Sequence, residues 1–97
     1  MWNWLNAFST SPEACRKMMM WGASKYQNKS PDLSFREALE LSLTRTRGSW
    51  KHDPTLIHNL RRDLDAAGPG ITEIEMATLA VEVEEQYNYG KPAEWRR

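Results

Sequence analysis

The chain has 97 residues, which is enough for one domain, and 40% of them are hydrophobic while 27% are charged. This is an ordinary globular composition, and it excludes wholesale disorder. The 13 basic residues cancel the 13 acidic residues, which argues against a generally basic nucleic-acid coat and against a generally acidic mimic. We therefore expect residues 1–97 to form a single domain.

Cysteine usage and hydropathy indicate the cellular compartment in which the protein acts. Cys15 is the one cysteine, so neither an intramolecular disulfide nor a multi-cysteine zinc site can form. No apolar run approaches the roughly 18 residues of a membrane span. The N-terminus also lacks the charged and apolar regions of a signal peptide. These features predict a soluble cytoplasmic protein without membrane association.

The first predicted helix spans residues 12–27. Ser11 is a typical N-cap, Pro12 suits the first helical position, and Ser30-Pro31 breaks the helix. Its expected buried face consists of residues at helical spacing, namely Cys15, Met18, Met19, Gly22 and Tyr26. A further short helical turn is expected around Trp2 to Phe8.

The second predicted helix spans residues 35–47. Ser34 and Glu37 have the spacing of a capping box, and Gly48 marks the end of the helix. The predicted buried residues of this helix are Phe35, Leu39 and Leu43. The segment that follows, up to His52, is expected to be a connection.

The third and fourth predicted helices span residues 54–67 and 73–89. Asp53-Pro54 opens the third, whose apolar stripe is Leu56, Ile57, Leu60 and Leu64, and Gly68-Pro69-Gly70 ends it. A second capping box, Thr72 with Glu75, opens the fourth, and Ile71 and Met76 have staple spacing. The wide apolar surface of this helix suits packing on two neighbours or across a dimer seam. We expect an all-α bundle of four main helices, with a loosely ordered tail at 91–97.

The charges are unevenly distributed along the chain. Residues 1–62 carry ten Lys/Arg and five Asp/Glu, whereas residues 63–97 carry three Lys/Arg and eight Asp/Glu. The two parts therefore have net charges of +5 and −5. This asymmetry is explained either by an interaction with a partner or a second copy, or by packing of the acidic last helix beside the basic helices.

Catalytic signals are weak in this sequence. Nucleophilic catalysis by Cys15 would need His52 or His58 nearby, and a lone thiol beside three methionines is more typical of a core. The two histidines are six residues apart, which is a poor spacing for a shared metal on a helix. Gly68-Pro69-Gly70 lacks the lysine and hydroxyl residue of a phosphate-binding loop. We therefore expect no enzymatic activity, no catalytic residue and no cofactor.

Two glutamate pairs offer a remote alternative. Glu37 with Glu40, and Glu82 with Glu85, are each three residues apart and so share a helix face. Brought together, they could hold a divalent metal for nucleotide chemistry. However, neither pair is accompanied by a histidine at ligand spacing, and Glu37 is predicted to serve a capping box. We therefore predict no metal site.

Residues 45–62 provide the main alternative, a small nucleic-acid-binding regulator. This segment contains residue types that contact phosphates and base edges: Arg45, Arg47, Lys51, Thr55, His58, Asn59 and Arg62. Against this hypothesis, Arg47 to His52 is longer than the turn of a helix-turn-helix motif. Asp63 and Asp65 would also repel phosphate.

The aromatic residues favour protein binding as the leading interpretation. Five tryptophans exceed the needs of so small a core, and Trp, Met and Arg are enriched at interface centres. The predicted protein-binding residues are Trp2, Trp4, Met18, Met20, Trp21, Glu82 and Glu85. We predict a non-enzymatic helical adaptor, inhibitor or regulator, of a kind often found in phages and mobile elements. Its aromatic/Met surface and acidic last helix would bind a protein partner or a second copy in a homodimer.

Overall fold

The computed structural model describes residues 11–89, with side chains through Tyr87, and it contains five helices and no strand in that range. The helices are α2 (Pro12–Lys29), α3 (Phe35–Thr46), α4 (Gly48–His52), α5 (Pro54–Ala67) and α6 (Glu73–Tyr89). The predicted all-α fold is confirmed. The predicted turn at residues 2–8 and the tail at 91–97 lie outside the described residues.

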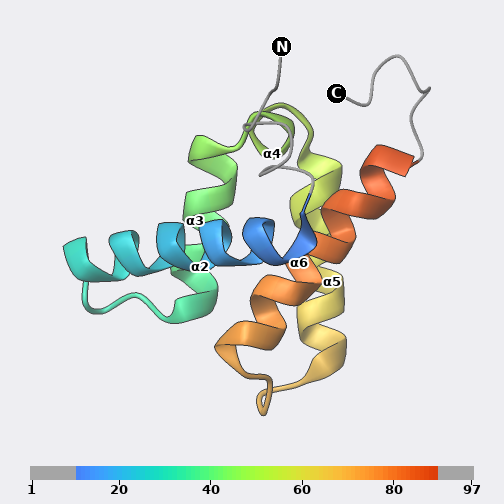
Figure 1. The fold of residues 1–97 in the computed structure, drawn as a ribbon. Coiled ribbons are helices and arrows are strands. Elements are labelled where there is room, and N and C mark those ends of the chain that lie inside the picture. Colours follow the sequence, from blue (N-terminus) through green and yellow to red (C-terminus); the bar gives the residue numbers. More distant parts are fainter. Residues whose placement is uncertain (1–10, 90–97) are drawn as a thin grey trace.

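The helices pack in a crossed arrangement (Figure 1). α2 runs across α3 and also contacts α6, while α5 and α6 are neighbours joined by a short turn. The short helix α4 contacts both α3 and α5 and turns the chain between them. α6 packs against α2 and α5 together, so much of its wide apolar surface is buried within one chain, as expected for a helix that packs on two neighbours. Ile74, at the start of α6, stays 56% exposed.

The predicted caps are present at four helix starts. Ser11 Oγ accepts from the N–H of Ala14 at 3.3 Å, and Asp53 Oδ1 accepts from the N–H of Thr55 at 2.9 Å. In the capping box of α3, the Ser34 N–H donates to Glu37 Oε1 at 2.9 Å and the Glu37 N–H donates to Ser34 Oγ at 3.1 Å. Thr72 and Glu75 form the same pair of bonds at 2.9 and 3.2 Å. These local bonds explain why the helix starts agree with the predictions.

The core lies where the helices meet. Its largest fully buried side chains are Met19, Leu39, Leu43, Leu56 and Leu60. The predicted stripes of α3 and α5 are buried, which confirms their interpretation. The staple residues Ile71 and Met76 are partly buried against this core.

Gly22 allows α2 and α3 to approach closely. A Cβ atom at this position would overlap the hydroxyl of Ser42, which is buried on α3. The neighbouring Ala23 and Ala38 are fully buried as well. Small side chains therefore define this crossing.

The structure corrects four details of the predictions. α2 extends to Lys29 rather than residue 27, and α3 ends at Thr46 rather than residue 47. The expected connection after residue 47 contains the helix α4, because burial of Trp50, which is 2% exposed, stabilises a segment with weak helical propensity. Met18, placed on the buried face of α2, is instead 41% exposed. Within residues 11–89, no helix is both long and apolar enough to cross a membrane.

Candidate functional site

Met18, Trp21 and Lys25 form one surface of α2, which we term the α2 outer face. The three residues follow at spacings of three and four, so they are neighbours along the helix surface. Trp21 is 66% exposed and Met18 is 41% exposed, and these are two of the three large hydrophobic side chains exposed among the described residues. The α2 outer face is therefore an aromatic and apolar surface open to solvent.

Lys25 orders this face. Its Nζ lies 4.5 Å from the centroid of the Trp21 ring, within the range of a cation–π contact. Such a contact favours one indole orientation and places a positive charge beside an apolar ring. The α2 outer face thus combines an aromatic anchor with a cation.

The other predicted protein-binding residues occupy different places. Met20 is partly buried against the core. Glu82 is exposed and Glu85 is half-buried on α6. Trp2 and Trp4 lie outside the described residues. The structure therefore groups Met18 with Trp21 and separates them from Met20 and from the acidic residues.

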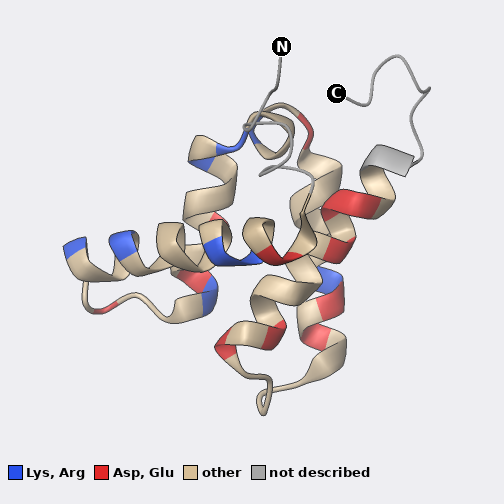
Figure 2. Cartoon of the chain, viewed as in Figure 1, with Lys and Arg blue, Asp and Glu red and all other residues tan. Residues whose placement is uncertain are grey.

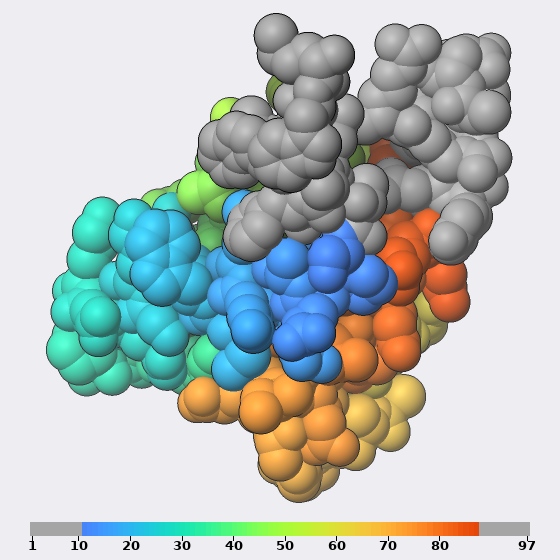
Figure 3. Space-filling model, viewed as in Figure 1, coloured from blue at the N-terminus to red at the C-terminus, as the bar shows by residue number. Residues whose placement is uncertain are grey.

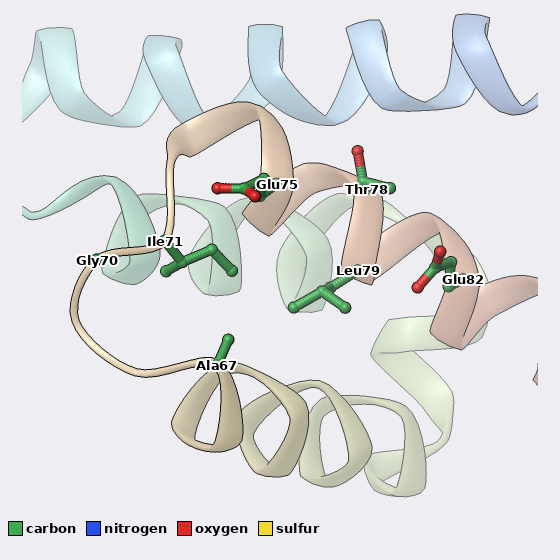
Figure 4. Close-up of a pocket in the computed structure, with 7 residues that line it drawn as sticks. All are labelled: Ala67, Gly70, Ile71, Glu75, Thr78, Leu79 and Glu82. Atoms are coloured by element: carbon green, nitrogen blue, oxygen red, sulfur yellow. The ribbon is translucent and has the colours of Figure 1, made fainter.

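A second surface feature is a hollow of about 400 Å³ between α5 and α6, which we term the α5–α6 hollow. Its lining consists of Ala67, Gly70, Ile71, Glu75, Thr78, Leu79 and Glu82. Figure 4 shows Ala67, Ile71 and Leu79 directed into one space, with Glu75 and Glu82 along its α6 side. The hollow therefore has an apolar floor and an acidic edge.

The two carboxylates at this edge differ in their engagement. Glu75 belongs to the capping box, where the backbone N–H and then the hydroxyl of Thr72 hold its pKa below the usual value. Glu82 makes no ion pair within residues 11–89. Glu82 can therefore receive a cation from a partner without breaking an ion pair of the described fold.

Glu84 anchors a polar cluster in the interior face of α6. Arg47 Nε and Nη2 donate to its two carboxylate oxygens at 2.9 and 2.7 Å, and Trp50 Nε1 donates to it at 2.8 Å. The side chain of Glu84 is 13% exposed and that of Arg47 is 25% exposed. Arg47 Nη2 also lies 3.9 Å from Cys15 Sγ. The cluster thus connects α2, the α3–α4 junction and α6.

Burial and the charges of this cluster shift the pKa of two groups, Cys15 and Arg47. Burial raises the pKa of the Cys15 thiol, although the positive charge of Arg47 opposes the rise. Burial would lower the pKa of Arg47, but its hydrogen bonds to Glu84 and the charge of Glu84 prevail and raise it. Cys15 is therefore a buried thiol held in its neutral form, which does not favour nucleophilic catalysis.

A second ion-pair network joins α3 to α5. Glu40 accepts from Arg36 at 3.2 Å and from Arg61 at 2.9 Å, and Arg36 also donates to Asp65 at 2.8 Å. The Arg36–Asp65 pair and the Arg47–Glu84 pair each join the basic part of the chain to the acidic part. Part of the uneven charge distribution is therefore compensated by packing within one chain (Figure 2).

The candidate nucleic-acid residues are only partly brought together. Arg45, Lys51, Thr55, His58 and Arg62 are exposed, Asn59 is half-buried, and Arg47 is committed to Glu84. Thr55, His58 and Arg62 share one side of α5, at spacings of three and four. Arg62 lies 3.3 Å from Asp63, so part of its charge is neutralised locally.

The glutamate pairs are not arranged as a metal site. Glu37 accepts bonds in its capping box and Glu40 is held by two arginines. No group of three His, Cys, Asp or Glu side chains that could hold a metal occurs in the part of the chain that the structure describes. His52 and His58 are both exposed, whereas Cys15 is buried.

Sequence reasoning did not find the α5–α6 hollow or the Glu84 cluster. The hollow depends on how the turn at residues 68–72 places Ile71 relative to Leu79. No local sequence pattern predicts this placement. A burial argument for Trp50 could have indicated that its indole N–H needs an acceptor. Comparisons of the chain with protein-family models, curated proteins and solved structures give no match, so functional inference depends on these residues alone.

Proposed function

We propose that this chain is a non-enzymatic protein-binding module whose α2 outer face docks on a protein partner. The observation that carries the proposal is the exposure of Trp21, 66%, next to the exposed Met18. A tryptophan offers about 150–250 Å² of contact area, and most large aromatic side chains of a small domain are buried. Trp50 of the same chain is buried in this way, with an exposed fraction of 2%.

The chemistry of the α2 outer face suits a protein interface. Tryptophan is among the residue types that dominate binding energy at interface centres, and methionine adapts to irregular surfaces. The stacking of Lys25 on Trp21 restricts the indole before binding, so less side-chain entropy is lost on association. The favoured partner surface therefore has an apolar recess for the indole and a negative charge for the ammonium group.

Site-specific photo-crosslinking tests this proposal. A benzoylphenylalanine at position 21 keeps an aromatic side chain at the centre of the α2 outer face. The matched control places the same group at His58, which is an exposed ring on α5. We expect protein adducts in cells from position 21 well above those from position 58. Equal or absent crosslinking at position 21 would refute a protein-binding role for this face.

A companion measurement separates binding from folding. Because Trp21 is mostly exposed, Trp21→Ala should change the free energy of unfolding by no more than about 0.5–1 kcal/mol. A large loss of stability would mean that the indole serves the fold instead. A tryptophan anchor in an interface is worth roughly 2–4 kcal/mol, so the same variant should weaken association by about 30-fold or more.

A second candidate function, nucleic-acid binding, is favoured by exposed cations near α4. Arg45 and Lys51 are exposed and form no ion pair within residues 11–89. The repulsion of phosphate by Asp63 and Asp65 is reduced, because Asp65 pairs with Arg36 and Asp63 pairs with Arg62. These cations are suited to phosphate contacts, whereas Arg47 is committed to Glu84.

Salt-dependent DNA binding tests this second candidate. Fluorescence anisotropy with a double-stranded DNA should show affinity at low salt that falls steeply as salt rises. Lys51→Ala should reduce the slope by about one phosphate contact, whereas the control Lys29→Ala, an exposed lysine at the end of α2, should not. Absence of binding at low salt by folded protein would exclude this function.

A further inference from the structure

We infer that the partner of the α2 outer face is a second copy of this chain, which receives Trp21 in its α5–α6 hollow. The inference deepens the proposed function and rests on it. It assigns a role to two surfaces that the described fold leaves open: an exposed aromatic projection on α2 and an apolar hollow at α5 and α6. Figure 3 shows α2 and the start of α6 both accessible on one face of the molecule.

The apolar parts of the two surfaces match. A volume of about 400 Å³ lies in the range of pockets that hold small molecules, and an indole is well within that size. Ile71 and Leu79 form the floor and are each only partly buried, so an inserted ring would remove further apolar area from water. Ala67 lines one side of the hollow with a small side chain (Figure 4). A larger side chain at this position would obstruct the entry of an indole.

The charges of the two surfaces are complementary. α2 carries four Lys/Arg and one acidic residue, whereas α6 carries five glutamates and no Lys/Arg. With Trp21 in the hollow, the stacked Lys25 would lie close to the acidic edge that Glu82 and Glu75 provide. The internal ion pair uses Arg47 and Glu84. Within residues 11–89, Lys25 and Glu82 form no ion pair. A neutral chain with separated charges is thereby attracted to itself in one orientation.

The contact joins two different surfaces, so its symmetry has consequences. A projection on one copy that enters a hollow on the next gives a closed dimer only when two such contacts fit around a two-fold axis. Otherwise the contact propagates into rings or longer assemblies. In either arrangement each copy contributes one projection and one hollow, and the two can be inactivated separately.

Mixing two variants of the full chain tests the inference. Trp21→Ala removes the projection but keeps the hollow, and Ala67→Arg places a long cation in the hollow but keeps the projection. In sedimentation equilibrium the wild type should self-associate, more weakly as salt rises, while each variant alone should associate at least about 30-fold more weakly. A mixture of both variants should recover a 1:1 dimer, because one complete contact is restored.

Several outcomes would overturn the inference. A wild type that stays monomeric at about 1 mM, or an oligomer that either variant leaves intact, excludes this contact. A mixture that does not recover association also excludes it, provided that both variants melt as the wild type does. Lys25→Glu supplies a second probe, since it should weaken association and Glu82→Lys in the same chain should restore it.

The crosslink at position 21 distinguishes failure of the inference from failure of the proposed function. An adduct of twice the chain mass, with its second site at the α5–α6 hollow, supports self-association. An adduct to a different protein overturns the second copy as occupant but retains the protein-binding function. If crosslinking at position 21 does not exceed that of the position-58 control, both the inference and the proposed function are refuted.

Discussion

Glu84 and Arg47 form a two-bond ion pair across the interior, with N···O distances of 2.9 and 2.7 Å between α6 and the start of α4. The Trp50 indole donates to the same carboxylate at 2.8 Å. Charged groups that are mostly withdrawn from water are retained at low cost only when their hydrogen bonds are satisfied. One carboxylate thus fixes the position of α4 against α6, and it holds the indole of a core tryptophan.

Loss of the arginine should leave this carboxylate poorly solvated. We expect Arg47→Ala to lower the free energy of unfolding by about 1.5–3 kcal/mol, the range for a hydrogen bond to a charged group. The matched control is Arg45→Ala, an exposed arginine near the end of α3 that should change stability by less than about 0.5 kcal/mol. Urea denaturation of both variants measures the difference, and equal effects would contradict a structural role for the pair.

The α2–α3 crossing gives a second prediction. Alanine favours a helix over glycine by roughly 1 kcal/mol, so a helical Gly→Ala change is normally stabilising. Gly22→Ala should instead destabilise, because its Cβ meets the Ser42 hydroxyl. Gly48→Ala, in α4 with no atom within 4 Å of the new Cβ, should be neutral or stabilising.

Thermal melting of the two glycine variants decides the sign. A rise in the melting temperature of Gly22→Ala would show that the two helices can separate without cost. The double variant Gly22→Ala with Ser42→Ala should recover part of the loss, since the remaining Ser42 Cβ lies 3.4 Å from the new atom. This rescue separates a steric cause from a general effect on α2.

Some parts of the fold were predictable from the sequence and others were not. The helix starts were predictable because each depends on residues within three positions of one another, such as Ser34 with Glu37. The burial of Leu56, Leu60 and Leu64 followed from helical spacing for the same reason. α4 was not predictable in this way, because it is stabilised by the burial of Trp50 against distant parts of the chain.

The candidate sites were less predictable than the helices. The exposure of Trp21 could be anticipated, because three methionines and a tryptophan in sequence cannot all face one core. The role of Arg47 could not be identified, since its partner Glu84 is 37 residues away and only the tertiary structure brings them together. The hollow likewise depends on the contact of α5 with α6, which spacing rules do not describe.

The capping boxes should make the fold sensitive to acid. Hydrogen bonds from the Ser34 backbone N–H and hydroxyl lower the pKa of Glu37, and those of Thr72 lower the pKa of Glu75. A carboxyl whose folded pKa is depressed stabilises the fold above its unfolded pKa of about 4.5. That contribution is lost as the pH falls through the lower, folded pKa.

A pair of glutamine substitutions checks this pH dependence. Gln can still accept the capping bonds but cannot titrate. In the double variant Glu37→Gln and Glu75→Gln, stability near pH 7 should be lower than that of the wild type, because the contribution of the charged carboxylates is lost. The fall between about pH 5 and pH 3 should be smaller, so that the two proteins converge at low pH. Urea unfolding across this range measures it, and an unchanged acid limb would assign the acid sensitivity to other carboxyls.

The thiol of Cys15 reports on the balance of charge in the Glu84 cluster. Burial raises the pKa of this thiol, Arg47 lowers it, and Glu84 raises it. Glu84→Gln should therefore lower the thiol pKa, because the guanidinium then acts without its counter-charge, whereas Arg47→Met should raise it. Because Cys15 is the one cysteine, the ¹³Cβ chemical shift of cysteine-labelled protein during a pH titration reads this group alone, whereas ultraviolet absorbance would also record the three tyrosines. A raised folded pKa also means that the thiol stabilises the fold below its unfolded pKa, near 9.0, and that this contribution is lost as the pH rises through the folded value.

The titration must be accompanied by circular dichroism, so that only folded protein is compared. Shifts in the same direction for both variants would mean that loosened packing, rather than charge, controls the thiol.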